Sequence, residues 1–378
     1  MSAPAFPFDA VLFDLDGTLV ATDGFWPQAA RKGALRAFAE LGLEREPPAS
    51  EEWMSMVGLS IDLGFGTVFA DLGEDARAHV MRRCLEEEQR ALDEGGAALL
   101  PGVEDVLDEL RARGVKMGIA SNCSRAYLDA MLDGVGLARW VGEPRCLDSP
   151  GIRNKADMVE DLVSTFDTRS VVMVGDRLGD RDAAWANGLP HVHLARGYGS
   201  HEEVRCEAVI DGFDQLLPRL ERRTTWLRSA IAALELPAGY CTLGVSGPLG
   251  AGKSLFARDL GRLLEAEGRV VRRIEADHAS GIGEMRELPA LQARGADVAI
   301  VVGATLGRGT AAESLDRLVA LAAPREVLER RIVGHHGRRS GSVVVERALE
   351  ALDRQLALEP GRRPDVELDA ANALGPPA

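Results

Sequence analysis

The sequence predicts two successive α/β domains: a Rossmann-like doubly wound parallel sheet with an inserted helical cap, then a second α/β domain. Three observations support this prediction. Short apolar runs alternate with amphipathic helical patterns, a long helical insertion follows the first run, and a new strand–glycine loop–helix pattern begins after a Pro-Ala-Gly linker at 237–239. Short buried strands separated by helices are typical of parallel sheets. A chain of 378 residues is long enough for two or three domains.

The first domain, expected over residues 1–222, contains four apolar runs that predict strands. A segment at about 20–98 separates the first run from the second and has helical periodicity, with turn signals at 46–48 and 95–96. A connection this long exceeds a simple crossover and therefore predicts an inserted helical subdomain. The predicted strands are Ala10–Phe13, Val115–Ala120, Ser170–Val174 and Pro190–Leu194.

The second domain, expected over residues 238–378, has its own alternation of strands and helices. A helix is predicted from Lys253 to about residue 267, and Arg-rich helices near the end of the chain. His335 and His336 have no identifiable metal-ligand partners in the pattern and are predicted to be loop residues. The apolar runs that predict this sheet are Cys241–Val245, Arg269–Ile274, Asp297–Val302, Leu315–Ala322 and Val366–Leu368.

Composition narrows the classes of function. The formal net charge of −15 argues against a nucleic-acid backbone as the main partner. Five cysteines lie far apart without a CxxC pair, which fits neither a disulfide framework nor a zinc site, so we expect reduced thiols in a cytoplasmic protein. No apolar stretch reaches membrane-spanning length, and the N-terminus lacks the basic region of a signal peptide. The oligomeric state is not indicated.

Two pairs of acidic residues come directly after predicted strands of the first domain. Asp14 and Asp16 follow the first run in FDLDGT, and Asp176 and Asp180 follow the third in GDRLGD. Ligands of open α/β sheets bind beyond the carboxyl ends of the strands, so we expect the four carboxylates at one edge. A cluster of hard oxygen ligands without His or Cys is typical of a Mg²⁺ site.

Groups suited to holding a phosphate accompany these acids. Ser121 and Asn122 follow the second strand in GIASN, where a hydroxyl and backbone N–H groups can hold a phosphoryl oxygen. Lys155 precedes a helical pattern and is one of only four lysines in the chain. A cation at this position can offset negative charge on the acids and on a phosphate.

The order and spacing of these residues resemble the haloacid dehalogenase superfamily, in its phosphatase branch. FDLDGTL corresponds to the first family motif, Ser121 to the second, Lys155 to the third, and Gly175-Asp176 with Asp180 to the fourth. The segments DAAWANGL and ARGYGS resemble phosphoglycolate-phosphatase-like members, in which a helical cap also follows the first motif.

The resemblance implies Mg²⁺-dependent hydrolysis of a small-molecule phosphate ester. Asp14 would be the nucleophile that forms an aspartyl-phosphate, and Asp16 would protonate the leaving oxygen and then activate water. Ser121 and Lys155 would hold the phosphoryl group, with Asn122 beside them. The metal would be bound by Asp14, by Asp16 through its backbone carbonyl, and by Asp176, with Asp180 in direct or indirect support.

The second domain contains the sequence GPLGAGKS at 247–254, which fits the P-loop pattern GxxxxGK[ST]. It follows a predicted strand and opens a predicted helix, which is the context that the motif requires. Backbone N–H groups of such a loop can surround phosphates at a helix N-terminus. The pattern predicts a P-loop NTPase α/β domain that binds ATP through Gly247, Gly250, Gly252 and Lys253, with Ser254 on the nucleotide's Mg²⁺.

This domain resembles nucleoside-type and other small-molecule P-loop kinases. The resemblance implies phosphorylation of a hydroxyl-bearing acceptor, with Asp277 as the base and lid arginines, Arg338 among them, closing on the phosphates. A solvated basic helix face is an equal alternative for each arginine. The strand DVAIVVG ends in Gly303, where such kinases carry an acid. Either Asp277 or Glu275 supplies the second contact to the metal, or kinase activity is weak or lost.

Three functions remain open at this point. The first is a bifunctional phosphatase–kinase acting on small metabolites such as nucleosides or sugars. The second is a polynucleotide end-healing 3′-phosphatase/5′-kinase, against which stand the acidic charge and a large cap that would hinder a polymer end. The third is a phosphatase with an ATP-sensing regulatory P-loop domain. Within the first domain, Thr18 and Asp16 favour phosphatase over dehalogenase, phosphonatase or mutase chemistry.

Overall fold

The fold is taken from a computed structural model that describes residues 6–199, 202, 204–276, 289, 292, 294–358, 361–370 and 374, with only the backbone of 309, 310 and 337–341. The described chain divides into two compact units. One is Phe8–Leu217, and the other combines Met1–Pro7 with Pro218–Ala378. The first unit ends close to the predicted limit at residue 222, and each unit contains its own parallel sheet.

The sheet of the first unit has six strands in the order β3-β2-β1-β4-β5-β6, all parallel. The four predicted strands are present, and the Rossmann-like arrangement is confirmed. The prediction missed both edge strands, β3 and β6, because each has only three residues and neither forms an apolar run of recognisable length. The strands are β1 Ala10–Phe13, β2 Lys116–Ala120, β3 Glu143–Arg145, β4 Val171–Gly175, β5 His191–Leu194 and β6 Ala208–Ile210.

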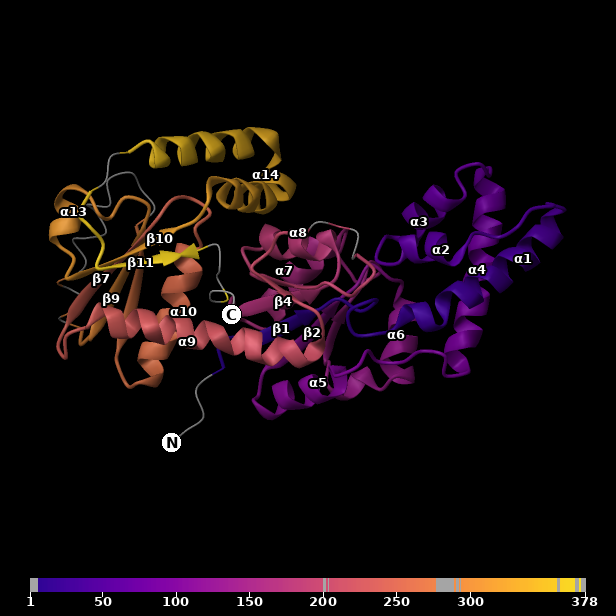
Figure 1. Cartoon of the computed structure of the whole chain (residues 1–378), viewed down its shortest axis with the longest axis horizontal. Helices are drawn as coiled ribbons and strands as arrows, with labels where there is room; N and C mark the ends of the chain where they lie inside the picture. Colours follow the sequence, from indigo (N-terminus) through magenta and orange to yellow (C-terminus); the bar gives the residue numbers. More distant parts are fainter. Residues whose placement is uncertain are drawn as a thin grey trace. The chain divides into compact units, whose positions relative to one another are not determined.

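Helices cover both faces of this sheet, with α7 and α8 on one side and α5 on the other (Figure 1). Successive side chains of a strand point to opposite faces. In β1, Leu12 packs with Leu162 of α7 and Ala183 of α8, while Phe13 on the opposite face stacks on Phe213 with ring centroids 6.3 Å apart. The helices are α5 Val103–Ala112, α6 Arg125–Gly134, α7 Lys155–Thr165, α8 Leu178–Ala186 and the first residues of α9 Leu216–Leu234.

The predicted insertion forms a helical cap of four helices. Its two linkers to the core pair with one another through an isolated bridge between Val20 and Leu99. Aromatic rings form its core, with Trp53 lying 5.6 Å from Phe69 and 6.2 Å from Phe65 between ring centroids. The cap helices are α1 Trp26–Leu41, α2 Ser50–Met56, α3 Ile61–Val68 and α4 Glu74–Asp93.

The sheet of the second unit has five parallel strands in the order β11-β10-β7-β9-β8. On one face, helices α9 and α10 contribute Leu227, Leu234, Phe256 and Leu260 to a core that includes Ile300 of the sheet. The strands are β7 Cys241–Ser246, β8 Val271–Glu275, β9 Val298–Gly303, β10 Arg317–Ala322 and β11 Val366–Asp369.

Besides α9, the described part of this unit contains α10 Lys253–Ala266, α13 Gly309–Glu313 and the long α14 Arg325–Leu356 (Figure 1). The prediction of loop positions for His335 and His336 was wrong, because both lie inside α14. The glycines of the VGHHG segment concealed a helix whose apolar side chains, such as Leu328 and Ile332, are buried in the core. None of the described helices is both long enough and apolar enough to cross a bilayer.

A close helix crossing in the cap provides a test of the fold. A Cβ atom at Gly33 of α1 would lie 2.5 Å from the backbone Cα of Cys84 in α4. Gly33→Ala must therefore separate the two helices, and we expect a loss of about 1–3 kcal/mol in stability. The measurement is urea unfolding followed by tryptophan fluorescence.

The matched control is Gly66→Ala in α3, where a new Cβ would meet nothing within 4 Å. Because alanine is the better helix former, this variant should be neutral or more stable by up to about 1 kcal/mol. Equal unfolding midpoints for the two variants would contradict the proposed tight contact between α1 and α4.

Candidate active site

The site lies at the carboxyl ends of the two central strands of the first sheet. Asp14 directly follows β1 and Asp176 directly follows β4, and the two strands are paired in parallel with Phe13 opposite Val174. The chain leaves β1 toward β2 on one side and returns to β4 on the other, so the strand order reverses here. In open α/β sheets, this reversal point is where ligands bind.

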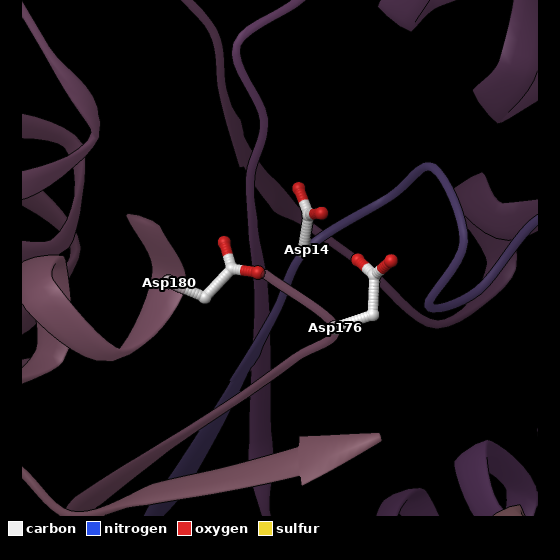
Figure 2. Close-up of side chains that lie close together, drawn as sticks. All are labelled: Asp14, Asp176 and Asp180. Atoms are coloured by element: carbon white, nitrogen blue, oxygen red, sulfur yellow. The ribbon is translucent and has the colours of Figure 1, made fainter. Parts of the chain in front are cut away.

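Three of the four carboxylates expected at this edge form a close group. Oxygens of Asp14, Asp176 and Asp180 lie within 4.8 Å of one another, and all three residues are buried (Figure 2). Lys155, the first residue of α7, donates hydrogen bonds of 2.7 Å to Asp14 Oδ1 and to Asp180 Oδ1. A single buried ammonium therefore joins acids from β1 and α8.

Backbone N–H groups hold Asp176 and Asp180 in place. Asp176 Oδ2 accepts hydrogen bonds from the N–H groups of Tyr198 at 2.5 Å and Gly199 at 3.2 Å. Asp180 Oδ2 accepts one from the N–H of Arg177 at 2.9 Å, within the first turn of α8. A side chain at Gly197 would place its Cβ 2.1 Å from the Cβ of Asp176, so only glycine allows this loop to pass so close.

Burial makes ionisation of these acids costly. Desolvation, followed by the charge of Asp180, raises the pKa of Asp14 well above its usual value despite the opposing effect of Lys155. The same two causes raise the pKa of Asp176 to about 6. Desolvation opposes the charge on Lys155 too, but the two neighbouring carboxylates outweigh it and raise its pKa. The cluster therefore has an excess of negative charge that Lys155 alone does not compensate.

The residues present fit a hard divalent cation such as Mg²⁺. Asp14 Oδ2 is buried without a hydrogen-bond partner among the described residues, although buried carboxylate oxygens normally have one. The donors are all carboxylate oxygens, the chemistry that Mg²⁺ prefers. Asp14, Asp176 and Asp180 are the side chains that could hold the ion. Asp16 is predicted to contact the metal through its backbone carbonyl, and its side chain lies outside this group of three.

The side chain of Asp16 has different neighbours. Its Oδ1 accepts hydrogen bonds from the hydroxyls of Thr22 at 2.6 Å and Tyr127 at 2.5 Å. Burial raises the pKa of Asp16, while the two hydroxyls partly oppose that shift. Neither hydroxyl was predicted, because Tyr127 lies in α6, 111 positions along the chain, and no sequence motif connects it to Asp16.

A cavity of about 90 Å³ opens beside Asp16, between core and cap. Ser121 and Asn122, the predicted phosphate-holding residues, both line it. The amide of Asn122 donates to the carbonyl of Gly58 in the cap at 3.0 Å. The guanidinium of Arg177, a residue that sequence reasoning missed, donates to the carbonyl of Val57 at 2.5 Å. Both contacts fix the cap's 57–58 segment over the site.

The glycine loop of the second unit also lies at a strand end, between β7 and the N-terminus of α10. Gly250 and Gly252 have φ angles of 82° and 76°, which favour glycine over other residues. Helix α10 begins at Lys253, whose ammonium donates to the carbonyl of Pro248 at 3.1 Å. The hydroxyl of Ser254 donates to Glu275 Oε2, at the end of β8, at 3.1 Å.

The side chains of two residues predicted for this unit's site lie outside the described part of the chain. Asp277 lies outside the described residues, and only the backbone of Arg338 is described, within α14. Gly303 does end β9, and a Cβ there would lie 3.0 Å from the carbonyl oxygen of Ala276. The residue that follows β8 therefore crowds a side chain at position 303.

Comparisons with known proteins concern the first unit. Residues 8–188 match the family of haloacid dehalogenase-like hydrolases. Phosphoglycolate phosphatase of Salmonella typhimurium is 25% identical over 238 residues, which cover 56% of this chain and 91% of that protein. The Escherichia coli protein of the same name is 24% identical with the same coverage.

Solved structures that are similar to this chain match about the same share of it. A predicted phosphoglycolate phosphatase from Haemophilus somnus has a TM-score of 0.49 at 20% identity, covering 56% of this chain and 97% of its own. CbbY from Rhodobacter sphaeroides, solved with phosphate, has a TM-score of 0.47 at 21% identity, covering 55% and 96%.

The fold, the acid cluster and the family match define a class of protein for this part of the chain. Residues 8–188 form a haloacid dehalogenase-like hydrolase domain. Among curated proteins, the domain and its flanking residues are similar to phosphoglycolate phosphatases.

The acid cluster predicts a pH-dependent response to Mg²⁺. The pKa of Asp176, about 6, lies above the ordinary value of 3.8, so the metal-free folded state loses stability as pH rises from 3.8 to about 6. A cation that binds the ionised carboxylates offsets this loss. We expect 5 mM Mg²⁺ (roughly a saturating concentration) to raise the melting temperature clearly at about pH 7.5 and little at about pH 5.

Two substitutions make this test specific. Asp176→Asn should remove the Mg²⁺-dependent shift at both pH values. Asp182→Asn on α8, the helix that carries Asp180, is the matched control, because Asp182 pairs with Arg181 at 2.7 Å and lies outside the cluster. Equal Mg²⁺ shifts at the two pH values, or a shift that survives in Asp176→Asn, would argue against a metal at this cluster.

Proposed function

We propose that the first unit hydrolyses a small phosphate monoester through an aspartyl-phosphate on Asp14. The observation that carries this proposal is the state of the Asp14 carboxylate. One oxygen is held by Lys155, and the other is buried without a partner at the reversal point of the sheet. An oriented carboxylate with one unoccupied oxygen at a ligand-binding edge is suited to nucleophilic attack.

In the first step, an oxygen of Asp14 forms a bond to phosphorus and the bond from phosphorus to the alcohol oxygen breaks. Asp16 donates its proton to that alcohol oxygen, a role supported by its raised pKa and by the orientation that Thr22 and Tyr127 impose. Lys155 holds Asp14 and offsets developing charge on the phosphoryl oxygens. Mg²⁺, when bound, would supply further neutralisation of that charge.

In the second step, Asp16 accepts a proton from a water that attacks the phosphorus of the aspartyl-phosphate. The acyl-phosphate bond breaks, phosphate leaves, and the carboxylate of Asp14 is restored. Ser121, a buried residue that lines the cavity, would hold a phosphoryl oxygen through its hydroxyl. The cap closes over these groups through Asn122 and Arg177, which limits entry of bulk water.

Asp14→Asn tests the nucleophile. A carboxamide has a similar shape but is a poor nucleophile, so the full-length variant should lose at least about 10³-fold in kcat for p-nitrophenyl phosphate with Mg²⁺. Its circular dichroism spectrum should not change. Asp105→Asn, an exposed position on α5, serves as the control and should retain full activity. Undiminished turnover by Asp14→Asn would remove Asp14 from the mechanism.

We further propose that the second unit binds ATP and phosphorylates a small hydroxyl-bearing metabolite. Positive φ angles in the glycine loop and its position at the N-terminus of α10 support phosphate binding by backbone N–H groups. Ser254 and Glu275 are hydrogen-bonded, so Glu275 is the acid best placed to act with Ser254 toward a nucleotide-bound Mg²⁺. Asp277 remains the proposed base for the acceptor hydroxyl.

Two alternative functions, an ATP-sensing regulatory module and a polynucleotide end-healing enzyme, require different properties. A regulatory module would need ATP binding without transfer, and the glycine at position 303 leaves that reading open. A polynucleotide end-healing enzyme would need a polymer end to reach Asp14. The cap contacts through Gly58 and Val57 narrow that access, which favours a small substrate.

Lys253→Ala tests the glycine loop. Loss of the ammonium should abolish ATP binding in isothermal calorimetry with Mg²⁺, while p-nitrophenyl phosphatase activity without ATP should be unchanged. Lys32→Ala, an exposed lysine in the cap, is the control for loss of a lysine. If the unsubstituted protein binds no ATP, both the kinase hypothesis and the ATP-sensing hypothesis fail. Binding without transfer to nucleosides or sugars would leave the sensing role.

A further inference from the structure

The cavity beside Asp16 has an unusual charge for a phosphatase related to proteins that act on a carboxylate-bearing ester. Among the residues that the structure describes, its lining contains two ionisable acids, Asp16 and Glu88, but no lysine, arginine or histidine. The remaining wall is largely apolar, with aromatic rings from core and cap. The apolar and aromatic lining residues are Trp26, Met56, Val57, Leu59, Ile61, Phe65, Leu85 and Tyr127.

Of the lining residues in the described part of the chain, Glu88 is the only ionisable one that comes from the cap. It lies on α4, and no hydrogen-bond or ion-pair partner is found for its carboxylate among the described residues. Burial, and then the charge of Asp16, raise the pKa of Glu88 to about 8. A carboxyl group held without a counter-ion in an apolar wall is costly unless a ligand supplies the missing partner.

Nearby arginines do not supply that partner. On the same helix, Arg83 bonds Glu40 and Glu86, and Arg90 pairs with Glu87. Lys155 is occupied by Asp14 and Asp180 at the phosphate end of the site. A carboxylate on the leaving alcohol would therefore lie beside Glu88 with no cation to balance it. Burial and Asp16 already disfavour the ionised form of Glu88, so a second carboxylate would disfavour it further, whereas an ammonium would stabilise it.

We infer that this cavity accepts phosphate monoesters whose alcohol carries a cationic amine, with Glu88 as the specificity-determining residue, and discriminates against esters whose alcohol carries a carboxylate. This inference rests on the proposed phosphatase function of the same site. An ammonium would form a charge-assisted hydrogen bond with Glu88. The aromatic walls around it can contribute cation–π attraction. A cavity of about 90 Å³ suits a short amino alcohol.

Three phosphate esters of nearly equal size distinguish the effect of the alcohol's charge from the effect of its shape. They are 2-aminoethyl phosphate, 2-hydroxyethyl phosphate and phosphoglycolate, assayed with the full chain and Mg²⁺. We expect kcat/KM to fall in that order, with about tenfold or more between the first and the last. Preference for phosphoglycolate, or equal rates on all three, would overturn the inference.

Glu88→Gln assigns the preference to one residue. The variant should lose about tenfold in kcat/KM for 2-aminoethyl phosphate, mainly through KM, and should gain on phosphoglycolate. Equal losses on all three esters would indicate a structural role and contradict the assignment. Asp93→Asn is the control, because Asp93 is exposed on the same helix and accepts a bond from Gln89. It should keep the order of preference of the unsubstituted protein.

Further measurements distinguish failure of the inference about Glu88 from failure of the phosphatase proposal. If Glu88→Gln does not fold, competition in the unsubstituted protein decides: ethanolamine should inhibit p-nitrophenyl phosphate hydrolysis at lower concentration than glycolate, and the reverse order contradicts the inference. If p-nitrophenyl phosphate is hydrolysed in an Asp14-dependent manner but phosphoglycolate is the better ester, the phosphatase proposal stands and the inference about Glu88 fails. If no ester is hydrolysed, both fail.

Discussion

The double ion pair of Lys155 with Asp14 and Asp180 is the interaction on which the first unit's site depends. It places one buried ammonium between acids from β1 and α8, at 2.7 Å from each. Three carboxylates share this edge, so one lysine leaves negative charge uncompensated. A buried excess of charge is tolerated only where another cation or a proton can join it. The site therefore needs a second cation or a proton to balance its charge. The surrounding loops hold the acids in position although the carboxylates repel one another.

The sequence allowed much of this edge to be predicted, because its acids follow strands directly. Asp14 and Asp176 end buried apolar runs, and parallel strands bring such positions together whatever the intervening loops do. Tyr127 and Glu88 could not be predicted in the same way. Each reaches the site from a helix whose pattern shows only which face is apolar, and the contact depends on how the cap or core helix packs. The edge strands β3 and β6 were missed for a related reason, since three residues carry too little periodicity.

Core and cap divide the recognition of a phosphate ester between them. The core supplies the groups that would meet the phosphoryl end, which are almost all charged or hydroxyl-bearing and backed by backbone N–H bonds. Among the described residues, the cap supplies most of the wall around the alcohol, and that part of the wall is apolar except for Thr22 and Glu88. Chemistry common to a family can thus stay fixed in the sheet while substrate choice changes through a few cap residues. Likeness to phosphoglycolate phosphatases over the shared fold therefore does not determine which alcohol this cavity accepts.

The second unit shows how a missing residue can follow from backbone packing. A Cβ at position 303 would lie 3.0 Å from the carbonyl oxygen of Ala276, whose own N–H donates to Val302 at 2.6 Å, so the residue that follows β8 crowds a side chain there. Glu275 Oε2 lies 3.1 Å from the hydroxyl of Ser254. The chain has no acid at the end of β9, but Glu275 at the end of β8 lies beside Ser254 of the glycine loop. Under the proposed kinase function, the glycine at position 303 is therefore no sign of lost activity, because Glu275 offers a carboxylate beside Ser254.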